Sequence, residues 1–185
     1  MEIIKLNPIS PEPEVVEKVR ATLLKGGVIA YPTDTVYGLG ALASDRLAVK
    51  KIKEIKGRAE NKPLSIMVRD FEMADYYGEL RPGAEKYLPG RFTILLKKKN
   101  TVPAWITPND FVGVRIPDYP FTKLLMTKLL EAVVTTSANL SRQQPAHSIP
   151  DLLAQVGERA DMIDLIVDAG ELAFNPPSTL INMSE

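Results

Sequence analysis

Short apolar runs alternate with helical patterns along the whole chain, and this alternation limits the possible folds more than any other feature of the sequence. The helical patterns cover Glu12–Lys25, Asp45–Lys56, Phe121–Glu131 and Ile149–Gly157. Strands that alternate with helices are typical of a sheet covered by helices. We therefore expect an α/β fold with an open, twisted, mixed or parallel sheet and flanking helices. Eight apolar runs are expected to form the strands: Ile3–Leu6, Val28–Tyr31, Leu64–Val68, Phe92–Leu96, Val112–Ile116, Ala132–Thr136, Leu165–Val167 and Ser178–Ile181.

Local signals refine the ends of the elements. Ser10 is expected to be the N-cap residue of the first helix, with Pro11 at its first helical position. The pair Gly26-Gly27 is expected to end this helix. Two regions have apolar residues that follow neither the helical nor the strand period and are expected to be surface loops: Tyr77–Pro89 and Asn100–Asp110.

Composition excludes several kinds of site. The length of 185 residues suits a single domain, residues 1–185. The 23 basic residues equal the 23 acidic ones, so the whole molecule is not drawn to nucleic acid or to anionic membranes. There is no cysteine and His147 is the only histidine, so we expect no cysteine nucleophile and no metal held by the protein. The N-terminus lacks a signal peptide and no apolar run has the length of a membrane span, so we expect a cytoplasmic protein.

The segment Tyr31–Gly40 follows an apolar run and gathers unusual residue types for a strand end. Its hydroxyls, including that of Thr33, can hold a small polar ligand, and ligands often bind at strand ends in open α/β folds. Gly38 and Gly40 would then let the backbone approach the ligand closely. The alternative is a turn that is stabilised by an Asx-type hydrogen bond from Asp34.

A basic stretch occupies the second helix and the connection after it. Three of its lysines, Lys50, Lys51 and Lys53, are expected on the solvated face of the helix. The other three cations lie at and beyond the helix end, where they can neutralise a polyphosphate. These are Lys56, Arg58 and Lys62. The alternative is an ordinary exposed basic loop.

Two further segments carry polar groups into apolar surroundings. Arg115 lies in a strand between apolar residues, and a buried arginine needs an anionic partner. That partner is either an internal carboxylate or a substrate carboxylate bound by two hydrogen bonds. Thr135, Ser137 and Asn139 follow another apolar run and supply hydrogen-bond groups for phosphate or carboxylate oxygens, or for a local cap or turn.

Taken in order, these motifs resemble those of the YrdC/TsaC family over nearly the whole chain. The resemblance is carried by Tyr31–Gly40, Lys56-x-Arg58, Lys62-Pro63-Leu64, Pro89-Gly90-x-x-Thr93, Val114-Arg115-x-Pro117, Thr136-Ser137-Ala138-Asn139 and Ser178-Thr179. It implies a sheet with a concave, positively charged face. It also implies an L-threonylcarbamoyladenylate synthase, which makes threonylcarbamoyl-AMP and pyrophosphate from L-threonine, bicarbonate and ATP for a tRNA modification.

The resemblance assigns roles to individual positions. Catalytic roles fall on Lys56, Arg58 and Arg115. Around L-threonine it places Thr33, Arg115, Thr135 and Ser178. Around ATP it places Lys56, Arg58, Lys62, Ser137 and Asn139. It further implies Mg²⁺ carried with ATP, a partner enzyme of tRNA modification, and possible RNA contact through the basic face.

Some positions depart from the family pattern. Tyr119 replaces a histidine, Arg91 replaces a proline and Arg142 replaces a glycine, and a terminal Arg-x-Gly strand is missing before Glu185. These departures resemble YciO-like paralogues, so the alternative is a nucleotide- or RNA-binding protein with weak or no synthase activity. A third reading, a carbamoyl-transfer domain of the hydrogenase-maturation type, lacks that type's zinc-finger and acylphosphatase regions.

Overall fold

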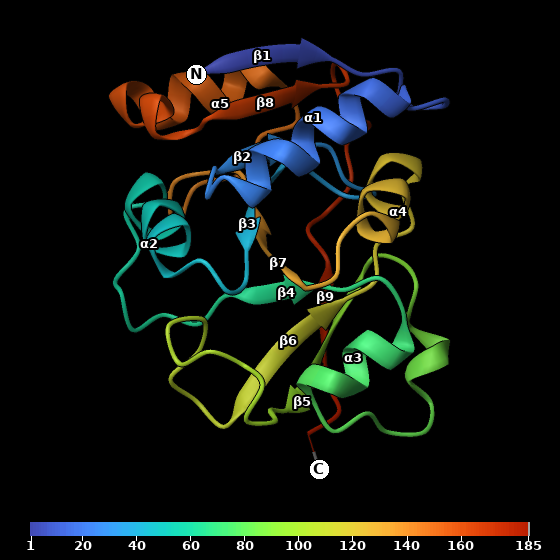
Figure 1. The fold of residues 1–185 in the computed structure, drawn as a ribbon. Coiled ribbons are helices and arrows are strands. Elements are labelled where there is room, and N and C mark those ends of the chain that lie inside the picture. The colour runs from blue at the N-terminus through green and yellow to red at the C-terminus, as the bar shows by residue number, and fades with distance from the viewer. Residues whose placement is uncertain (185) are drawn as a thin grey trace.

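The computed structural model describes residues 1–184, and its centre is one sheet of nine strands in the order β1-β8-β2-β3-β7-β4-β6-β5-β9 (Figure 1). Four neighbouring pairs are parallel and four are antiparallel, which confirms the expected mixed sheet. No helix among the described residues is long and apolar enough to cross a membrane. The strands are β1 (Glu2–Lys5), β2 (Ile29–Tyr31), β3 (Gly38–Leu42), β4 (Ser65–Met67), β5 (Phe92–Lys97), β6 (Phe111–Arg115), β7 (Val133–Ser137), β8 (Leu165–Asp168) and β9 (Thr179–Asn182).

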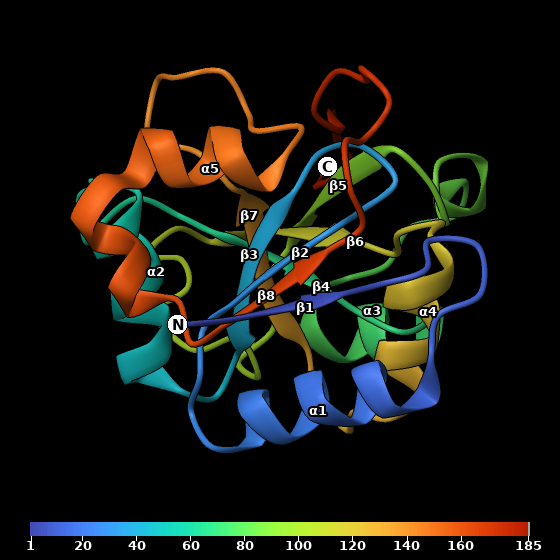
Figure 2. The ribbon, with the colours of Figure 1, turned by 90° about the horizontal axis from the view of Figure 1, so that it is seen from above.

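Helices cover both sides of this sheet, as the α/β prediction requires. Figure 2 shows α1 and α4 on one side, and α5 with the loop before it on the other. In α1, apolar residues at helical spacing form one face, and this face is buried in the structure: Val16, Val19 and Leu23. The helices are α1 (Pro13–Leu24), α2 (Arg46–Ile55), α3 (Phe71–Tyr77), α4 (Pro120–Thr127) and α5 (Ile149–Val156), with short 3-10 turns at Ala84–Lys86 and Gly157–Met162.

The start of α1 differs from the expectation. The helix begins at Pro13, and neither Ser10 nor Pro11 caps or opens it. A residue that precedes proline is pushed out of the helical region, so Glu12 is extended and the helix can begin only at Pro13. The side-chain oxygen of Asn7 accepts hydrogen bonds from the backbone of Ile9 and Ser10, which holds these residues in a turn.

Two elements were not expected from the sequence. α3 is a short helix whose N-cap, Asp70, accepts a hydrogen bond from the backbone of Met73 at 2.8 Å. β3 occupies Gly38–Leu42, which contains the glycines assigned above to a ligand-binding turn. Another helix is shorter than expected, because α4 ends at Thr127 and the chain then turns toward β7.

The glycines of β3 make room for the ring of Tyr31, and Gly38 also lines the cavity at which a ligand is expected, whereas Gly40 is not among the lining residues of that cavity. A Cβ atom at Gly40 would lie 2.9 Å from a ring carbon of Tyr31, and one at Gly38 would lie 3.3 Å from the same ring. Tyr31 comes from β2, and its hydroxyl lies 2.7 Å from the hydroxyl of Thr135 on β7. The ring therefore crosses β3, the strand between them, at the two positions that lack side chains.

Substituting Gly40 tests this packing. In Gly40→Ala the added methyl meets the Tyr31 ring and also Val133 Cγ1 at 3.0 Å, both in the buried sheet. Overpacking of this kind costs about 1–3 kcal/mol, so the urea midpoint should fall clearly. Gly38→Ala is the graded comparison and should cost less, because its contact is longer. A Gly40→Ala protein with the wild-type midpoint would contradict the crossing.

Candidate active site

A cavity of about 180 Å³ opens where the loop after β2 meets the ends of β6 and β7. It is lined mainly by hydroxyl side chains and contains two arginines, Arg58 and Arg115, with no carboxylate among its described lining residues. We call it the inner cavity. Its hydroxyl-bearing residues are Thr33, Thr35, Tyr37, Ser65, Thr93, Thr135, Thr136, Ser137 and Ser178.

Arg115 supplies the charge at the base of the inner cavity. Its guanidinium Nη2 donates to Asp34 Oδ1 at 2.7 Å, and only 10% and 6% of the two side chains are exposed. The internal carboxylate partner that the sequence left open is therefore present. Among the described residues, Nη2 is the nitrogen of this guanidinium that makes a hydrogen bond, so the group keeps donor capacity beside the cavity. Arg115 can thus hold Asp34 and a second anion together.

Asp34 also fixes the loop that forms one wall of the cavity. Its Oδ2 accepts a hydrogen bond from the backbone of Asp118 at 3.2 Å, just beyond β6. The alternative of an Asx-type hydrogen bond from Asp34 is not what holds this turn, because the hydroxyl of the preceding residue, Thr33, makes the bonds within it. Thr33 Oγ1 accepts from the backbone of Thr35 and Val36, and donates to the Val36 carbonyl at 2.7 Å. The structure places Thr33 at the cavity, but its hydroxyl proton is used inside the turn.

Two other residues expected around L-threonine, Thr135 and Ser178, line the inner cavity, and the hydroxyl of each lies close to a second hydroxyl. The hydroxyl of Thr135 lies 2.7 Å from that of Tyr31, and burial raises the pKa of Tyr31 to about 12. The hydroxyl of Ser178 lies 2.8 Å from that of Thr93. The sequence does not predict the roles of Tyr31 and Thr93 beside the cavity, because hydrogen-bond partners across a sheet cannot be deduced from spacing along the chain.

A larger hollow of about 720 Å³ adjoins the inner cavity and shares Arg58 and Ser137 with it. We call it the outer cavity. Its described lining residues include four cations and no carboxylate, so it suits a polyanion. The cations are Lys56, Arg58, Lys62 and Arg142, and the polar lining is completed by Ser137, Asn139 and Ser141.

Lys56 lies in the wall of the outer cavity but directs its charge into the protein. Only 3% of it is exposed. Its ammonium donates to the Ser137 carbonyl and, at 3.0 Å each, to the carbonyl and side-chain oxygens of Asn139. Burial, and to a smaller extent the charge of Arg58, lowers the pKa of Lys56 to about 7, while the three oxygens favour its protonated form.

In this arrangement the ammonium of Lys56 has no proton left for a phosphate, and its expected contact with ATP stays a prediction. An ammonium has three protons, and all three are used by the segment that carries Ser137 and Asn139. Asn139 is held in the same way, because its amide nitrogen donates to the carbonyls of Leu140 and Gln143. Lys56 and Asn139 therefore shape the outer cavity, whereas Arg58 and Lys62 have charge to offer a ligand.

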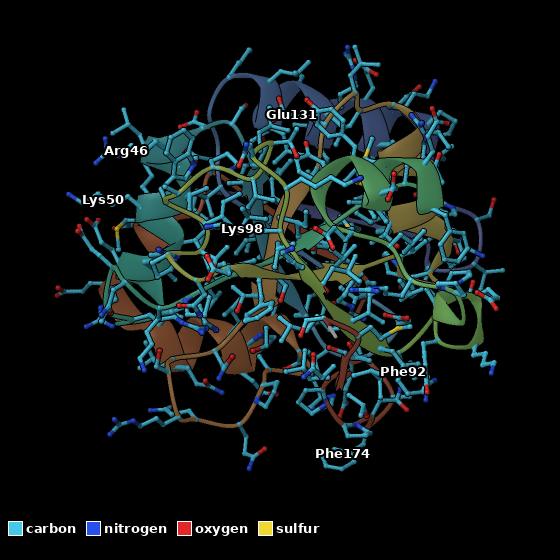
Figure 3. The ribbon with its side chains drawn as sticks, turned by 90° about the horizontal axis from the view of Figure 1, so that it is seen from below. Arg46, Lys50, Phe92, Lys98, Glu131 and Phe174 are labelled. Atoms are coloured by element: carbon cyan, nitrogen blue, oxygen red, sulfur yellow. The ribbon has the colours of Figure 1, made fainter. Side chains whose placement is uncertain are left out.

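The remaining basic residues divide differently from the expectation. Lys53 is only 4% exposed, and its ammonium donates to the carbonyls of Glu60 and Trp105, so its placement on the solvated face was wrong. Lys50 is exposed, lies 3.7 Å from Glu54 and projects outward from α2 (Figure 3). Arg142 adopts the left-handed region with φ 72°, a conformation that favours glycine and explains the family preference at this position.

A third hollow, of about 330 Å³, shares Thr33 and Thr35 with the inner cavity. Tyr119 lines it, and its hydroxyl is buried without a partner. Arg91 also lines it and donates to Asn175 at 2.8 Å. His147 lies outside all three hollows and stacks on Phe174, whose side chain stands at the outer edge of the molecule (Figure 3).

The fold and these hollows define an α/β protein with two adjoining cavities, one small and rich in hydroxyls and one large and cationic. The chain belongs to the Sua5/YciO/YrdC family, because a family model described as "Telomere recombination" matches residues 21–185. This confirms the family that the sequence motifs resemble.

Individual relatives agree with this assignment. A Methanocaldococcus jannaschii protein is 35% identical over the whole chain and 88% of its own length. A Pyrococcus abyssi protein named threonylcarbamoyl-AMP synthase is 35% identical over 87% of this chain and 48% of its own. Among solved structures, P. abyssi Sua5 complexed with L-threonine has a TM-score of 0.90 and 31% identity, over the whole chain and 55% of that protein. Escherichia coli YciO has a TM-score of 0.86 and 27% identity, over the whole chain and 92% of its own. This chain thus spans about half the length of the P. abyssi proteins.

Removing the ammonium of Lys56 tests its internal role. Lys56→Ala leaves two buried carbonyls without their donor, which should lower the free energy of unfolding by about 1–3 kcal/mol. Lys51→Ala is the matched control on the same helix and should stay within about 0.5 kcal/mol of the wild type, as is usual for partly exposed lysines. Urea unfolding of the three proteins measures the difference. Equal midpoints for the two variants would show that the ammonium does not hold this segment.

Proposed function

We propose that this chain is an L-threonylcarbamoyladenylate synthase, a nucleotidyltransferase that joins L-threonine, bicarbonate and ATP into threonylcarbamoyl-AMP and releases pyrophosphate. The observation that carries the proposal is the pair of adjoining cavities. One is small and rich in hydroxyls, the other is large and cationic, and they share Arg58 and Ser137. The named activity of the P. abyssi relative and the L-threonine in the P. abyssi structure support this reading.

The inner cavity has the size and polarity for an amino acid. Its volume of about 180 Å³ leaves room for several water molecules, which suits a small amino acid. A carboxylate in this cavity would bind the guanidinium of Arg115 through its remaining N–H groups, and a charged hydrogen bond would fix its orientation. Thr135 and Ser178 offer hydroxyls on the facing walls, and these suit the remaining polar groups of L-threonine.

The outer cavity supplies what a nucleotide triphosphate needs. Arg58 and Lys62 offer positive charge, and Arg142 adds a guanidinium at the position where the family pattern has glycine. Lys56 and Asn139 contribute indirectly, since they fix the segment that carries Ser137. Mg²⁺ would bind mainly to the phosphates of ATP and to water, because the described lining of this cavity offers no carboxylate.

The reaction requires positioning more than covalent catalysis. The amine of L-threonine and bicarbonate give a carbamate and water. A carbamate oxygen then attacks the α-phosphorus, and the bond to pyrophosphate breaks. Because Arg58 lines both cavities, it lies where the two ligands meet and can stabilise the charge that spreads over the phosphate oxygens. No protein nucleophile takes part in these steps. A tRNA-modification enzyme would accept the product, and RNA contact through the basic outer cavity belongs to the same proposal.

The direct test is the release of pyrophosphate by the purified chain with Mg²⁺ and ATP. Release should require both L-threonine and bicarbonate. Arg58→Ala should reduce turnover roughly ten- to a hundredfold, because a charged hydrogen bond to phosphate contributes about 1.5–3 kcal/mol. Lys51→Ala is the control and should stay within about twofold.

Two outcomes would contradict the proposal. Release that is equal without L-threonine would remove the amino acid from the reaction. Binding of ATP with no release under any condition would favour a YciO-like nucleotide-binding protein. That alternative fits the likeness to E. coli YciO and the substitutions at Tyr119 and Arg142.

A further inference from the structure

Tyr31 contacts the wall of the inner cavity from the interior of the protein, and none of its own surface is exposed. Its ring crosses β3 at Gly38 and Gly40, and its hydroxyl lies 2.7 Å from Thr135 Oγ1. Thr135 belongs to β7 and lines the cavity, as Arg115 does. The phenol thus touches a residue of the cavity wall from the side that faces the protein interior.

The direction of this hydrogen bond follows from the groups around the phenol. Among the described residues, the acceptors near the Tyr31 hydroxyl are Thr135 Oγ1 at 2.7 Å and the sulfur of Met67 at 4.0 Å. A thioether at that distance is a weak acceptor, so the phenol proton belongs to Thr135. Burial raises the pKa of Tyr31 to about 12, so the phenol keeps this proton at neutral pH.

The hydroxyl of Thr135 is left with one proton to donate. Its oxygen accepts the phenol proton, and no other hydrogen bond to this hydroxyl occurs within residues 1–184. The donor can then turn only toward the cavity. If the bond ran the other way, Thr135 would face the cavity as an acceptor and the phenol would depend on the weak contact with Met67.

We propose that Tyr31 is a positioning residue that makes the Thr135 hydroxyl a hydrogen-bond donor into the inner cavity. The ligand atom that meets Thr135 is therefore an acceptor oxygen, and the carboxylate held by Arg115 supplies it. The ammonium of the amino acid points away from Thr135, toward the end of the cavity shared with the outer one. This inference rests on the proposed function, and it adds an orientation for the amino acid and a role for a residue that never touches it.

Calorimetric titration of L-threonine into single and double variants tests this relay. Tyr31→Phe keeps the ring over β3 and removes only the hydroxyl. It should weaken L-threonine binding roughly three- to tenfold, the effect of losing one hydrogen bond, and leave ATP binding unchanged. Thr135→Val should weaken L-threonine binding at least as much. Tyr31→Phe should add nothing further in the Thr135→Val protein, because Tyr31 acts through Thr135.

Two controls separate this role from a general effect on the fold. Tyr77→Phe also removes a buried phenol, one that accepts a hydrogen bond from the backbone of Ala132 at 3.2 Å and lies outside the cavity lining. It should bind L-threonine like the wild type. Thr135→Ser keeps a hydroxyl at this position, so adding Tyr31→Phe to it should weaken L-threonine binding further, unlike in the Thr135→Val protein.

The outcomes distinguish the inference from the function beneath it. Wild-type affinity in Tyr31→Phe, or an equal loss with and without the Thr135 hydroxyl, would overturn the relay and leave the proposed function standing. A wild-type protein that binds no L-threonine would overturn the proposed function, and the relay with it.

Discussion

The buried ion pair between Asp34 and Arg115 is the interaction on which the site depends. It joins the loop after β2 to the end of β6, two segments 81 residues apart in the sequence. A buried arginine without a partner would be costly, so the pair allows the guanidinium of Arg115 to face a cavity that is lined mainly by hydroxyl groups. Asp34 accepts a hydrogen bond from Nη2 of Arg115 and thereby helps to fix the orientation of the guanidinium plane. Because the pair is close to neutral, a bound carboxylate would bring one negative charge, and the other cation among the described residues of the cavity wall is Arg58.

Arg58 thereby couples the two cavities electrostatically. It donates one hydrogen bond, to the Pro63 carbonyl at 2.9 Å, and it lines both hollows. A ligand in either cavity would lie beside the same guanidinium. Lys56 supports this arrangement from within, since it holds the Ser137–Asn139 segment against the helix end that precedes Arg58. The basic stretch of the sequence thus contains one cation that builds the site and others that can contact ligands.

Much of the fold could be predicted from the sequence, because its strands and helices carry clear apolar periods. The exceptions have physical causes. β3 contains two glycines, and glycines in a sequence usually indicate a loop. Here they belong to a strand because the ring of Tyr31 occupies the space that their side chains would need. Lys53 was expected on the solvated face and Lys56 in contact with a polyphosphate, because the sequence does not show the backbone carbonyls that surround their ammonium groups. Thr33 lines the inner cavity, but its bonding within its own turn depends on local geometry that the sequence does not show. For Arg115, the sequence required an anion and could not choose between an internal one and a ligand. The structure shows the first and leaves donor capacity for the second.

The most direct test of this account is the affinity for L-threonine of wild-type protein and of Arg115→Lys, measured by calorimetry with ATP affinity as the reference. Lysine keeps the charge near Asp34 but lacks the planar fork. The account predicts that L-threonine binding weakens about tenfold or more, since a charged hydrogen bond contributes about 1.5–3 kcal/mol, while ATP binding changes little. Unchanged L-threonine affinity together with a lower melting temperature would contradict it, and would show that Arg115 serves only the ion pair with Asp34.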